Sequence, residues 1–448
     1  MLSPADAQQR CHDLIAVALR AGAAGADAVY IASASESVHV RLSKLEGVDR
    51  SESEHIGLRA FVGAGSASIG STDLSAEALG ELAGRAVAMA KAAPEDRYAG
   101  LASEDLLLRG PPPELDLHDP HERSPASLRE FALEAEEAAR AVPGVTNSEG
   151  GGASAAEATS ALVTSHGFAG SYRTTSHSLS ASVVAGEGGG MQRDYCWRSA
   201  RHAADLPPAS AIGALAGSRA VSRCSPGRLA SGPRPVVFDP RVGGSLIGHL
   251  LAAISGSAIA RRASFLLEDE GRQIFSGGVT IAEDPLRPRG PRSRPFDGEG
   301  LATQPRLLIE DGRLTGWLMD SASARQLGRT PTGHAARGSS GPPSISVGNV
   351  TLQAGKVGRA ELLADIADGV LVTELIGQGV NIVTGDYSRG ASGYRIVAGE
   401  VVGPVAEFTI AGNLREMFAA LTPADDLEVY RGIDVPSLRV DGMVVAGD

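Results

Sequence analysis

Residues 370–410 read VLVTELIGQGVNIVTGDYSRGASGYRIVAGEVVGPVAEFTI, and this stretch decides the fold class. It contains seven glycines, which separate runs rich in β-branched residues. This pattern is typical of antiparallel strands joined by tight turns. Helical segments elsewhere in the chain do not alternate regularly with strands, so a parallel doubly wound sheet is not expected. We therefore predict an α+β protein whose C-terminal part is a mostly antiparallel, β-rich domain with a few helices.

Upstream of this stretch, a unit of helix, strands and helix is expected twice. Apolar residues recur with helical spacing over 5–22 and 74–93, and runs such as DAVYIAS, SVHVRLS and HIGLRAFVG lie between them. A Pro-rich stretch (110–125) follows, and the same order then appears again, ending with the helix PPASAIGALAGSRAVSRC. The predicted domains are 1–110, 111–228 (a separate domain or a continuation of the first unit) and 229–448.

Two helices in the sequence leave a structural choice open. The helix after the Pro-rich stretch begins either at Ser124, with Pro125 in the first helical position, or at Ser127, with Glu130 completing a capping box. Residues 242–260 carry no formal charge and match a bilayer span in length, but they include a histidine, serines and glycines. We expect a buried helix over about 240–260 and no membrane segment.

Composition excludes several classes of protein. The chain has 448 residues, 43% of them apolar, which is too many for a disordered chain. A net charge of −12 with only three lysines does not suit a nucleic-acid binder. The three cysteines, Cys11, Cys196 and Cys224, are too few and too scattered for a disulfide framework, and the N-terminus has no apolar signal region. A cytoplasmic protein with reduced thiols is expected.

No complete catalytic motif is found in the sequence. There is no GxxxxGK[ST] phosphate loop and no GxSxG nucleophile elbow. The single His-Glu dipeptide, His121-Glu122, has no second histidine one turn later, as a helical metalloprotease site requires. His118 and His121 could chelate a metal weakly, although a solvated loop is the simpler interpretation.

Other polar residues are candidates for a pocket or an interface. His249 lies in the middle of the uncharged helix, where a core or interface histidine is more common than a ligand. His334 lies in a loop of small residues that could face a pocket, without an acidic partner nearby in the sequence. The cluster Asp386-Tyr387-Ser388-Arg389 suits either a loop that touches a ligand or a turn with internal hydrogen bonds.

Several strings in the C-terminal half resemble the TldD/PmbA family, specifically its PmbA branch, also called TldE. They are RRASFLLEDEGRQI (261–274), RPFDGEGL (294–301), DGRLTGWLMDSASARQLG (311–328), VTELIGQGVNIVTGDYSRGASGY (372–394) and FTIAGNLREMF (408–418). The resemblance implies a heterodimer of a TldD-like and a TldE-like subunit that acts as a zinc metalloprotease. It implies substrates that are unfolded or short peptides, such as leader peptides of modified peptide natural products.

The resemblance also implies where a metal site would lie. In the TldD branch a helix bears HExxxH, and a Cys near the C-terminus supplies a further ligand. In this chain the aligned window has Gly244 at the first ligand position, Ser245 at the general-base position and His249 at the second ligand position, and no Cys follows Cys224. A catalytic zinc normally has about three protein ligands. The resemblance therefore implies no catalytic or metal-binding residue in this chain, with zinc on the TldD-like partner.

The non-catalytic subunit would then supply an interface and one wall of a peptide groove. The candidate groove or interface residues are His249, His334, Gln378, Asp386, Tyr387 and Arg389. Strands within 377–394 could offer a free edge to an extended peptide, and Arg389 could bind a carboxylate. A cluster that merely stabilises the fold is the simpler interpretation of these residues. The alternatives are a self-sufficient hydrolase that uses His249 and His334, and a non-enzymatic peptide-binding or modulator protein.

Overall fold

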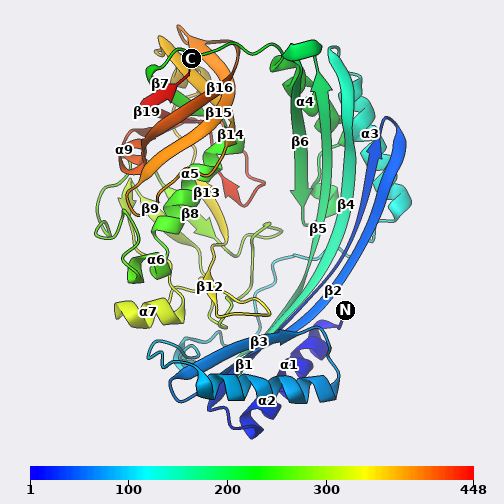
Figure 1. Ribbon diagram of the computed structural model, residues 1–448, viewed down its shortest axis with the longest axis vertical. Coiled ribbons are helices and arrows are strands. Elements are labelled where there is room, and N and C mark those ends of the chain that lie inside the picture. Colours follow the sequence, from blue (N-terminus) through cyan, green and yellow to red (C-terminus); the bar gives the residue numbers. More distant parts are fainter. Residues whose placement is uncertain (448) are drawn as a thin grey trace.

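Two lobes face each other in the computed structural model, which describes residues 1–447 (Figure 1). The N-terminal lobe contains one six-stranded antiparallel sheet in the order β3-β2-β1-β4-β5-β6. Its strands are β1 (Gly25–Arg41), β2 (Lys44–Val62), β3 (Gly65–Ser71), β4 (Val145–Thr164), β5 (Ala169–Ala185) and β6 (Gln192–Ala200). Strands from both sides of the Pro-rich stretch thus share one sheet, with β1 and β4 paired at its centre. The domain boundaries at 110 and 228 remain predictions.

Four helices cover the two ends of this sheet. They are α1 (Pro4–Arg20), α2 (Ala76–Ala92), α3 (Pro125–Arg140) and α4 (Ala209–Ser222). The first pair buries its apolar face against β1 and β2, and the second pair packs against β4 and β5. The Ser124 side chain accepts a hydrogen bond from the Ser127 backbone N–H, and Pro125 occupies the first turn. Of the two predicted starts for α3, the structure therefore has the one at Ser124.

The strands of this lobe are longer than the separate runs in the sequence suggest. DAVYIAS and SVHVRLS belong to a single strand, β1, which has 17 residues. Ala, Ser and Glu between the two runs are poor strand formers in isolation. They stay extended because β2 and β4 pair with β1 on both sides over nearly its whole length.

The C-terminal lobe has a mostly antiparallel sheet in the order β16-β15-β14-β7-β19-β17. Its strands are β7 (Gly232–Phe238), β14 (Asp368–Ile376), β15 (Asp386–Val397), β16 (Glu400–Asn413), β17 (Leu421–Pro423) and β19 (Leu438–Ala446). An extra pairing between β16 and β19 closes five of these strands into a ring. Strands β14 to β16 come from the stretch 370–410, which therefore forms antiparallel strands as predicted. Together with the helices, these sheets confirm the α+β class.

A second sheet, two short strands and several short helices complete this lobe. The sheet has the order β10-β9-β8-β13-β18. Its members are β8 (Ile281–Asp284), β9 (Arg306–Glu310), β10 (Arg313–Leu314), β13 (Asn349–Leu352) and β18 (Ile433–Asp434). The remaining elements are the pair β11 (Ala335–Ala336) and β12 (Ser344–Ile345), with α5 (Pro240–Ala253), α6 (Gly256–Ala260), α7 (Ser321–Leu327), α8 (Arg359–Leu363) and α9 (Leu414–Ala419).

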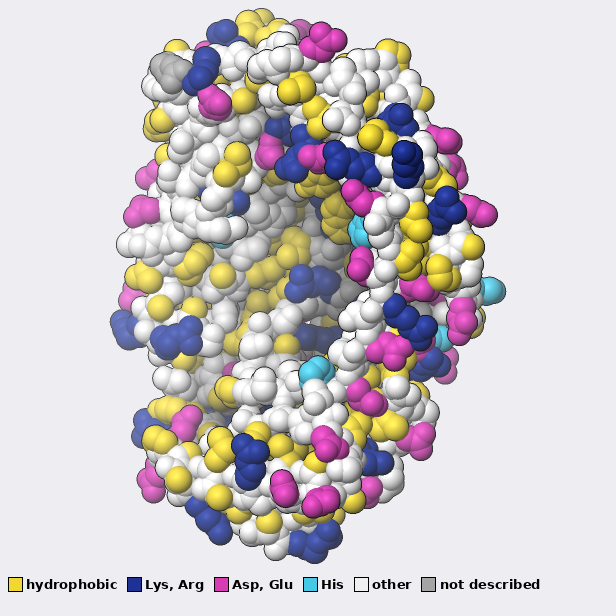
Figure 2. All heavy atoms as spheres, turned by 45° about the vertical axis from the view of Figure 1, so that its right-hand side comes forward, with side chains coloured by type: hydrophobic (Ala, Val, Ile, Leu, Met, Phe, Trp, Pro, Cys, Tyr) yellow, Lys and Arg dark blue, Asp and Glu magenta, His cyan; other side chains and the backbone are white. Residues whose placement is uncertain are grey.

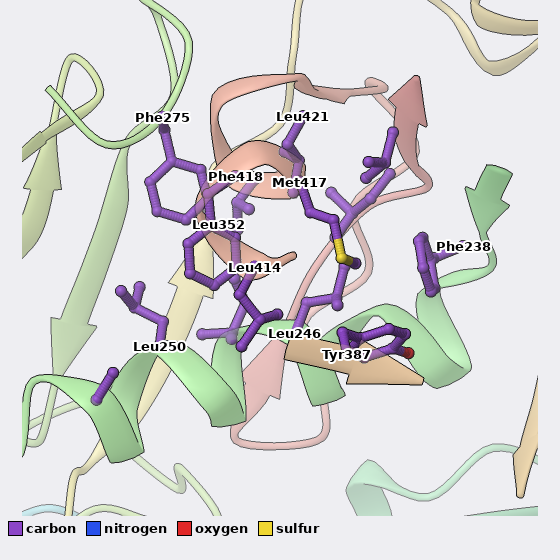
Figure 3. Packing of buried hydrophobic residues seen from close by; sticks show 14 of the residues in the cluster. Phe238, Leu246, Leu250, Phe275, Leu352, Tyr387, Leu414, Met417, Phe418 and Leu421 are labelled. Atoms are coloured by element: carbon purple, nitrogen blue, oxygen red, sulfur yellow. The ribbon is translucent and has the colours of Figure 1, made fainter. Parts of the chain in front are cut away.

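Helix α5 lies in the core of the C-terminal lobe. Figure 3 shows its Leu246 and Leu250 among the side chains of a cluster that also holds Phe275 and Phe418. Those two rings stack with centroids 4.6 Å apart. The sequence predicts one helix over about 240–260, and that is wrong in one respect. Ser255 is extended, with ψ 125°, so α5 ends at Ala253 and α6 begins at Gly256.

No helix among residues 1–447 is long and apolar enough to cross a membrane.

Candidate functional site

A cavity of about 470 Å³ lies at the junction of the two lobes, and we call it the junction pocket. Figure 2 shows the molecule hollowed between the lobes, with basic side chains on the walls of the hollow. The N-terminal lobe contributes residues of β6 and the end of α4, and the C-terminal lobe contributes the first half of α5 and parts of β14, β15 and β18. The residues that line it are Asp194, Tyr195, Arg223, Pro240, Arg241, Val242, Gly244, Ser245, Arg292, Thr373, Glu374, Leu375, Arg389, Arg431 and Ile433.

The window that the resemblance equates with the metal site of the TldD branch, residues 244–249, runs along α5 beside this pocket. Gly244 and Ser245 line the pocket, whereas His249 does not. A regular α-helix advances about 100° per residue, so side chains five positions apart point about 140° away from each other. Because α5 is continuous from Pro240 to Ala253, it does not bring positions 244 and 249 onto one face.

The donor atoms in this window do not fit a catalytic zinc. Gly244 offers no side-chain donor, and the Ser245 hydroxyl donates to the Val242 carbonyl at 2.7 Å. His249 supplies one imidazole, whose Nε2 is buried without a hydrogen-bond partner. Across residues 1–447, no group of three or more His, Cys, Asp or Glu side chains is arranged to hold a metal ion. One nitrogen donor falls short of the roughly three protein ligands that a catalytic zinc needs.

Three of the residues singled out in the sequence come together beside α5. Tyr387 and Arg389 are alternate residues of β15 and both are buried. The Tyr387 ring meets the His249 ring edge-on, with centroids 6.0 Å apart. Burial, and then the positive charge of Arg389, lower the pKa of His249, so its imidazole is neutral at neutral pH. Burial raises the pKa of Tyr387, only partly offset by Arg389, so the phenol is neutral as well.

Asp386 lies on the opposite face of β15. It is exposed, accepts a hydrogen bond from the Thr384 hydroxyl at 2.6 Å and receives another from Asn413 at 3.2 Å. The sequence suggested a loop or a turn for the cluster at residues 386–389, and both interpretations are wrong, because these four residues begin strand β15 and pair with β16. Gln378 is exposed in the loop between β14 and β15.

The free strand edge predicted within 377–394 is wrong. Strand β15 pairs with β14 on one side and with β16 on the other, so its backbone groups are already used. The N-terminal lobe does have an edge strand, because β6 is the last strand of its sheet and, among residues 1–447, pairs only with β5. Asp194 and Tyr195 of β6 line the junction pocket.

His334 lies apart from the other candidates, buried beside β8. It is 2% exposed, and its Nε2 lies 2.7 Å from a carboxylate oxygen of Glu283, while its Nδ1 lies 2.8 Å from the Thr332 hydroxyl. Burial alone would raise the pKa of Glu283, but the contact with His334, the hydrogen bond from the Gly348 N–H and the charge of Arg294 together outweigh it and hold that pKa below its ordinary value. The acidic partner comes from 51 residues upstream, where sequence proximity cannot reveal it.

The histidines of the Pro-rich stretch line a separate cavity of about 550 Å³ on the N-terminal lobe. His121 Nδ1 lies 2.9 Å from Asp119, and His118 lies 3.5 Å from Glu157. His177 faces the same cavity and lies 3.5 Å from Asp119. As noted above, no cluster in the described part of the chain forms a metal site.

Arg223 and Arg241, which line the junction pocket together with Arg389, were not singled out from the sequence. Asp194 receives two hydrogen bonds from Arg241, at 2.9 and 3.0 Å, and one from Arg223 at 3.3 Å. Arg223 also pairs with Glu374 of β14. Burial alone would raise the pKa of Asp194, but the hydrogen bonds and charge of Arg241, the Tyr195 N–H and the charge of Arg223 together outweigh it and hold the pKa below its ordinary value. These ion pairs connect the two lobes, and no sequence spacing predicts them because they join distant elements.

Comparisons with known proteins cover almost the whole chain. Residues 231–447 match the family model of the PmbA/TldA metallopeptidase C-terminal domain, and residues 118–223 and 26–90 match the models of its central domain and domain 1. The chain is 36% identical to Metalloprotease PmbA of Escherichia coli O157:H7, in a match that covers 100% of this chain and 98% of that protein. It is 35% identical to a PmbA homolog of Haemophilus influenzae, over 97% of this chain and 94% of that one.

Solved structures agree with this assignment. TldE from Thermococcus kodakarensis has the same fold, with a TM-score of 0.87 at 22% identity, covering 98% of this chain and 100% of that one. A Bacteroides thetaiotaomicron protein described as a candidate modulator of DNA gyrase gives a TM-score of 0.90 at 25% identity, with both chains fully covered. The resemblance seen in the C-terminal strings is confirmed, and the chain belongs to the PmbA/TldD family of metallopeptidases.

Proposed function

We propose that this chain is the metal-free subunit of a two-subunit zinc metallopeptidase, in which a TldD-like partner holds the zinc and the catalytic residues. The observation that carries the proposal is the donor set on α5. A chain related to metallopeptidases over its full length keeps only His249 at the positions aligned with the metal site. The substrates we propose are unfolded or short peptides, such as leader peptides of modified peptide natural products.

In this proposal the chain contributes one wall of a peptide groove. The outer edge of β6 lies next to the junction pocket and has no neighbouring strand among residues 1–447. At Tyr195 the backbone N–H donates to the Asp194 side chain and the carbonyl accepts from Arg219, so a peptide that pairs there would replace these two side-chain contacts. An extended peptide that pairs along such an edge is bound largely through its main chain, so binding depends little on its sequence. That property suits a peptidase that acts on unfolded segments of differing sequence.

The proposal is tested by measuring peptide cleavage with three samples: this chain, an HExxxH-bearing TldD-like homologue, and the two co-expressed. We expect the co-expressed pair to purify as a complex and to cleave an unstructured peptide, and the lone chain to be inactive. In the matched control, the Glu of the partner's HExxxH motif is replaced by Gln. This variant should still form the complex but should not cleave the peptide. Cleavage by the lone chain at the rate of the complex would refute the proposal.

The self-sufficient hydrolase with His249 and His334 as ligands has little support. The His334 ring is engaged with Glu283 and Thr332 and does not line the junction pocket. A non-enzymatic modulator is the second candidate, favoured by the description of the Bacteroides thetaiotaomicron relative. It predicts that the chain does not co-purify with the TldD-like homologue, so the same experiment separates the two candidates.

A further inference from the structure

The junction pocket carries more positive charge than its own carboxylates neutralise. Two acidic residues, Asp194 and Glu374, line it, and both are used by Arg223 and Arg241 in the ion pairs described above. Three more arginines line the same pocket and have no carboxylate partner among residues 1–447. They are Arg292, Arg389 and Arg431.

The contacts of two of these arginines are to neutral groups. Arg292 donates to the Val347 carbonyl at 3.4 Å, and Arg431 donates to the Arg241 carbonyl at 3.4 Å and lies over the Tyr430 ring. Burial and the nearby charge of Arg294 lower the pKa of Arg292, but a guanidinium remains protonated at any physiological pH. Their charges are therefore present in the pocket, and neither arginine forms an ion pair with a carboxylate among residues 1–447, although Glu283 attracts Arg292 from a greater distance.

Arg389 and Thr373 add two buried polar atoms without partners. Arg389 is 8% exposed and Thr373 is 6% exposed, and within the described range 1–447 neither the Arg389 Nε nor the Thr373 Oγ1 has a hydrogen-bond partner. Both residues line the pocket from neighbouring strands, and a register shift in β14 between Val372 and Glu374 falls at Thr373. A β-bulge at such a register shift changes the direction in which a side chain points. Buried polar groups are normally satisfied, so two unpartnered donors in one cavity point to an absent acceptor.

The groups around Arg389 do not supply that acceptor. Its neighbours His249 and Tyr387 are both neutral, so they can accept a hydrogen bond but do not offset the charge of Arg389, and the carboxylates of the pocket are engaged with other arginines. A guanidinium and a hydroxyl side by side match the oxygens of a carboxylate or a phosphate. The volume of about 470 Å³ exceeds what a bare anion needs and lies in the range of small-molecule sites.

We propose that the junction pocket binds a small ligand through a carboxylate or phosphate group, which Arg389 and Thr373 hydrogen-bond and which Arg292 and Arg431 attract. The site lies entirely within this chain. It does not depend on the partner subunit, so it can be tested on the purified chain alone.

The first experiment is calorimetric titration of the full-length chain at constant ionic strength with three probes: inorganic phosphate, trialanine with a free C-terminal carboxylate, and trialanine amide. Saturable binding of phosphate alone identifies a phosphate ligand. Saturable binding of trialanine but not of its amide identifies a peptide carboxylate. Either result supports the proposal, and the absence of saturable binding for phosphate and for trialanine overturns it.

Variants then place the binding in this pocket. Arg389→Gln should weaken binding roughly tenfold or more and Thr373→Val roughly threefold to tenfold, because a charged and a neutral hydrogen bond are lost. The matched control is Arg395→Gln, which removes an arginine of the same strand that pairs with Asp368 outside the pocket, and it should bind as the wild type does. Unchanged affinity in Thr373→Val and Arg389→Gln would overturn the proposal. Thr373→Val conserves side-chain volume and decides the question if Arg389→Gln fails to fold.

Discussion

Replacing Asp194 by Asn tests the ion-pair junction that builds the pocket. The Asp194 side chain is 1% exposed and sits between Arg241 of the C-terminal lobe and Arg223 of the N-terminal lobe, which are 11% and 9% exposed at their side chains. Asn keeps the shape and one acceptor oxygen but removes the negative charge. Arg223 retains Glu374 as a partner, so Arg241 is the charge left without compensation.

The size of the effect follows from that burial. Breaking a buried ion pair by neutralising one member costs about 3–5 kcal/mol, because the remaining charge stays desolvated. We expect the free energy of unfolding to fall by about 3 kcal/mol, near the lower end of this range. The reason is that Asn keeps one acceptor oxygen and Arg223 keeps Glu374 as a partner. The double variant Asp194→Asn/Arg241→Gln should lose less than the sum of the single variants, since the uncompensated charge is gone.

The same carboxylate predicts a dependence on pH. The folded-state pKa of Asp194 lies below its unfolded value of about 3.9, so the unfolded chain takes up the proton first as the pH falls. The stabilisation is therefore complete at neutral pH and is lost as the pH drops below about 4 towards the folded pKa. The difference in stability between wild type and Asp194→Asn should shrink over that range and stay constant from pH 6 to 8.

Urea unfolding measures both effects. Circular dichroism follows the whole chain, and fluorescence reports on each lobe, since Trp197 lies in β6 and Trp317 in the core of the C-terminal lobe. The control is Glu52→Gln, which removes an exposed carboxylate paired with Arg50 and should leave the unfolding midpoint unchanged. A decrease in the free energy of unfolding of less than about 1 kcal/mol for Asp194→Asn would refute the reasoning. It would mean that solvent screens the ion pairs of Asp194 as it does those of exposed residues.

Three further perturbations follow from the geometry. Gly244→His combined with Ser245→Glu should not yield stoichiometric zinc by elemental analysis of dialysed protein, because α5 keeps the two imidazoles on different faces and no third ligand is near. His334→Ala should lower the unfolding free energy by about 2–3 kcal/mol in urea titrations and should not alter anion binding. The substitution removes the imidazole partner of the buried Glu283 carboxylate, which retains the hydrogen bond from the Gly348 N–H. Gly393→Ala should cost about 3 kcal/mol by the same measurement, because a Cβ there would overlap a backbone carbonyl of β14.

For each of these three variants there is either a matched control or a result that would contradict the prediction. Gly403→Ala changes a glycine of β16 with open space around the added methyl, and it should be tolerated. Tightly bound zinc in the Gly244→His/Ser245→Glu protein would show that a third donor can be recruited. Weakened anion binding in His334→Ala would show that this histidine acts on the junction pocket.

Local signals in the sequence predicted the elements that depend on neighbouring residues. The starts and ends of α1 to α4 follow capping serines, prolines and apolar spacing, and the glycines of 370–410 mark strand turns. These local signals gave wrong element boundaries where pairing with residues distant in the sequence determines the structure. The break at Ser255 coincides with a bridge to Leu318, and the full length of β1 depends on β4, more than a hundred residues away.

The candidate site was predictable only in part for the same reason. The sequence identified Tyr387 and Arg389 as candidates but not their position on a strand, and it is the pairing of β15 with β14 and β16 that puts both on one face and Asp386 on the other. The arginine cluster was not predictable, since Arg223, Arg292 and Arg431 come from segments that meet only when the lobes pack. The pocket has more arginines than carboxylates only because the folded chain brings these residues together. The net negative charge of the whole sequence gives no sign of it.

The zinc content of the lone chain and of its complex with a TldD-like homologue tests the central claim most directly. Both samples are purified, dialysed against a weak chelator and measured by elemental analysis. The donor set on α5 predicts about one zinc ion per complex and none above background in the lone chain. Stoichiometric zinc in the lone chain would contradict the claim that this subunit holds no catalytic metal.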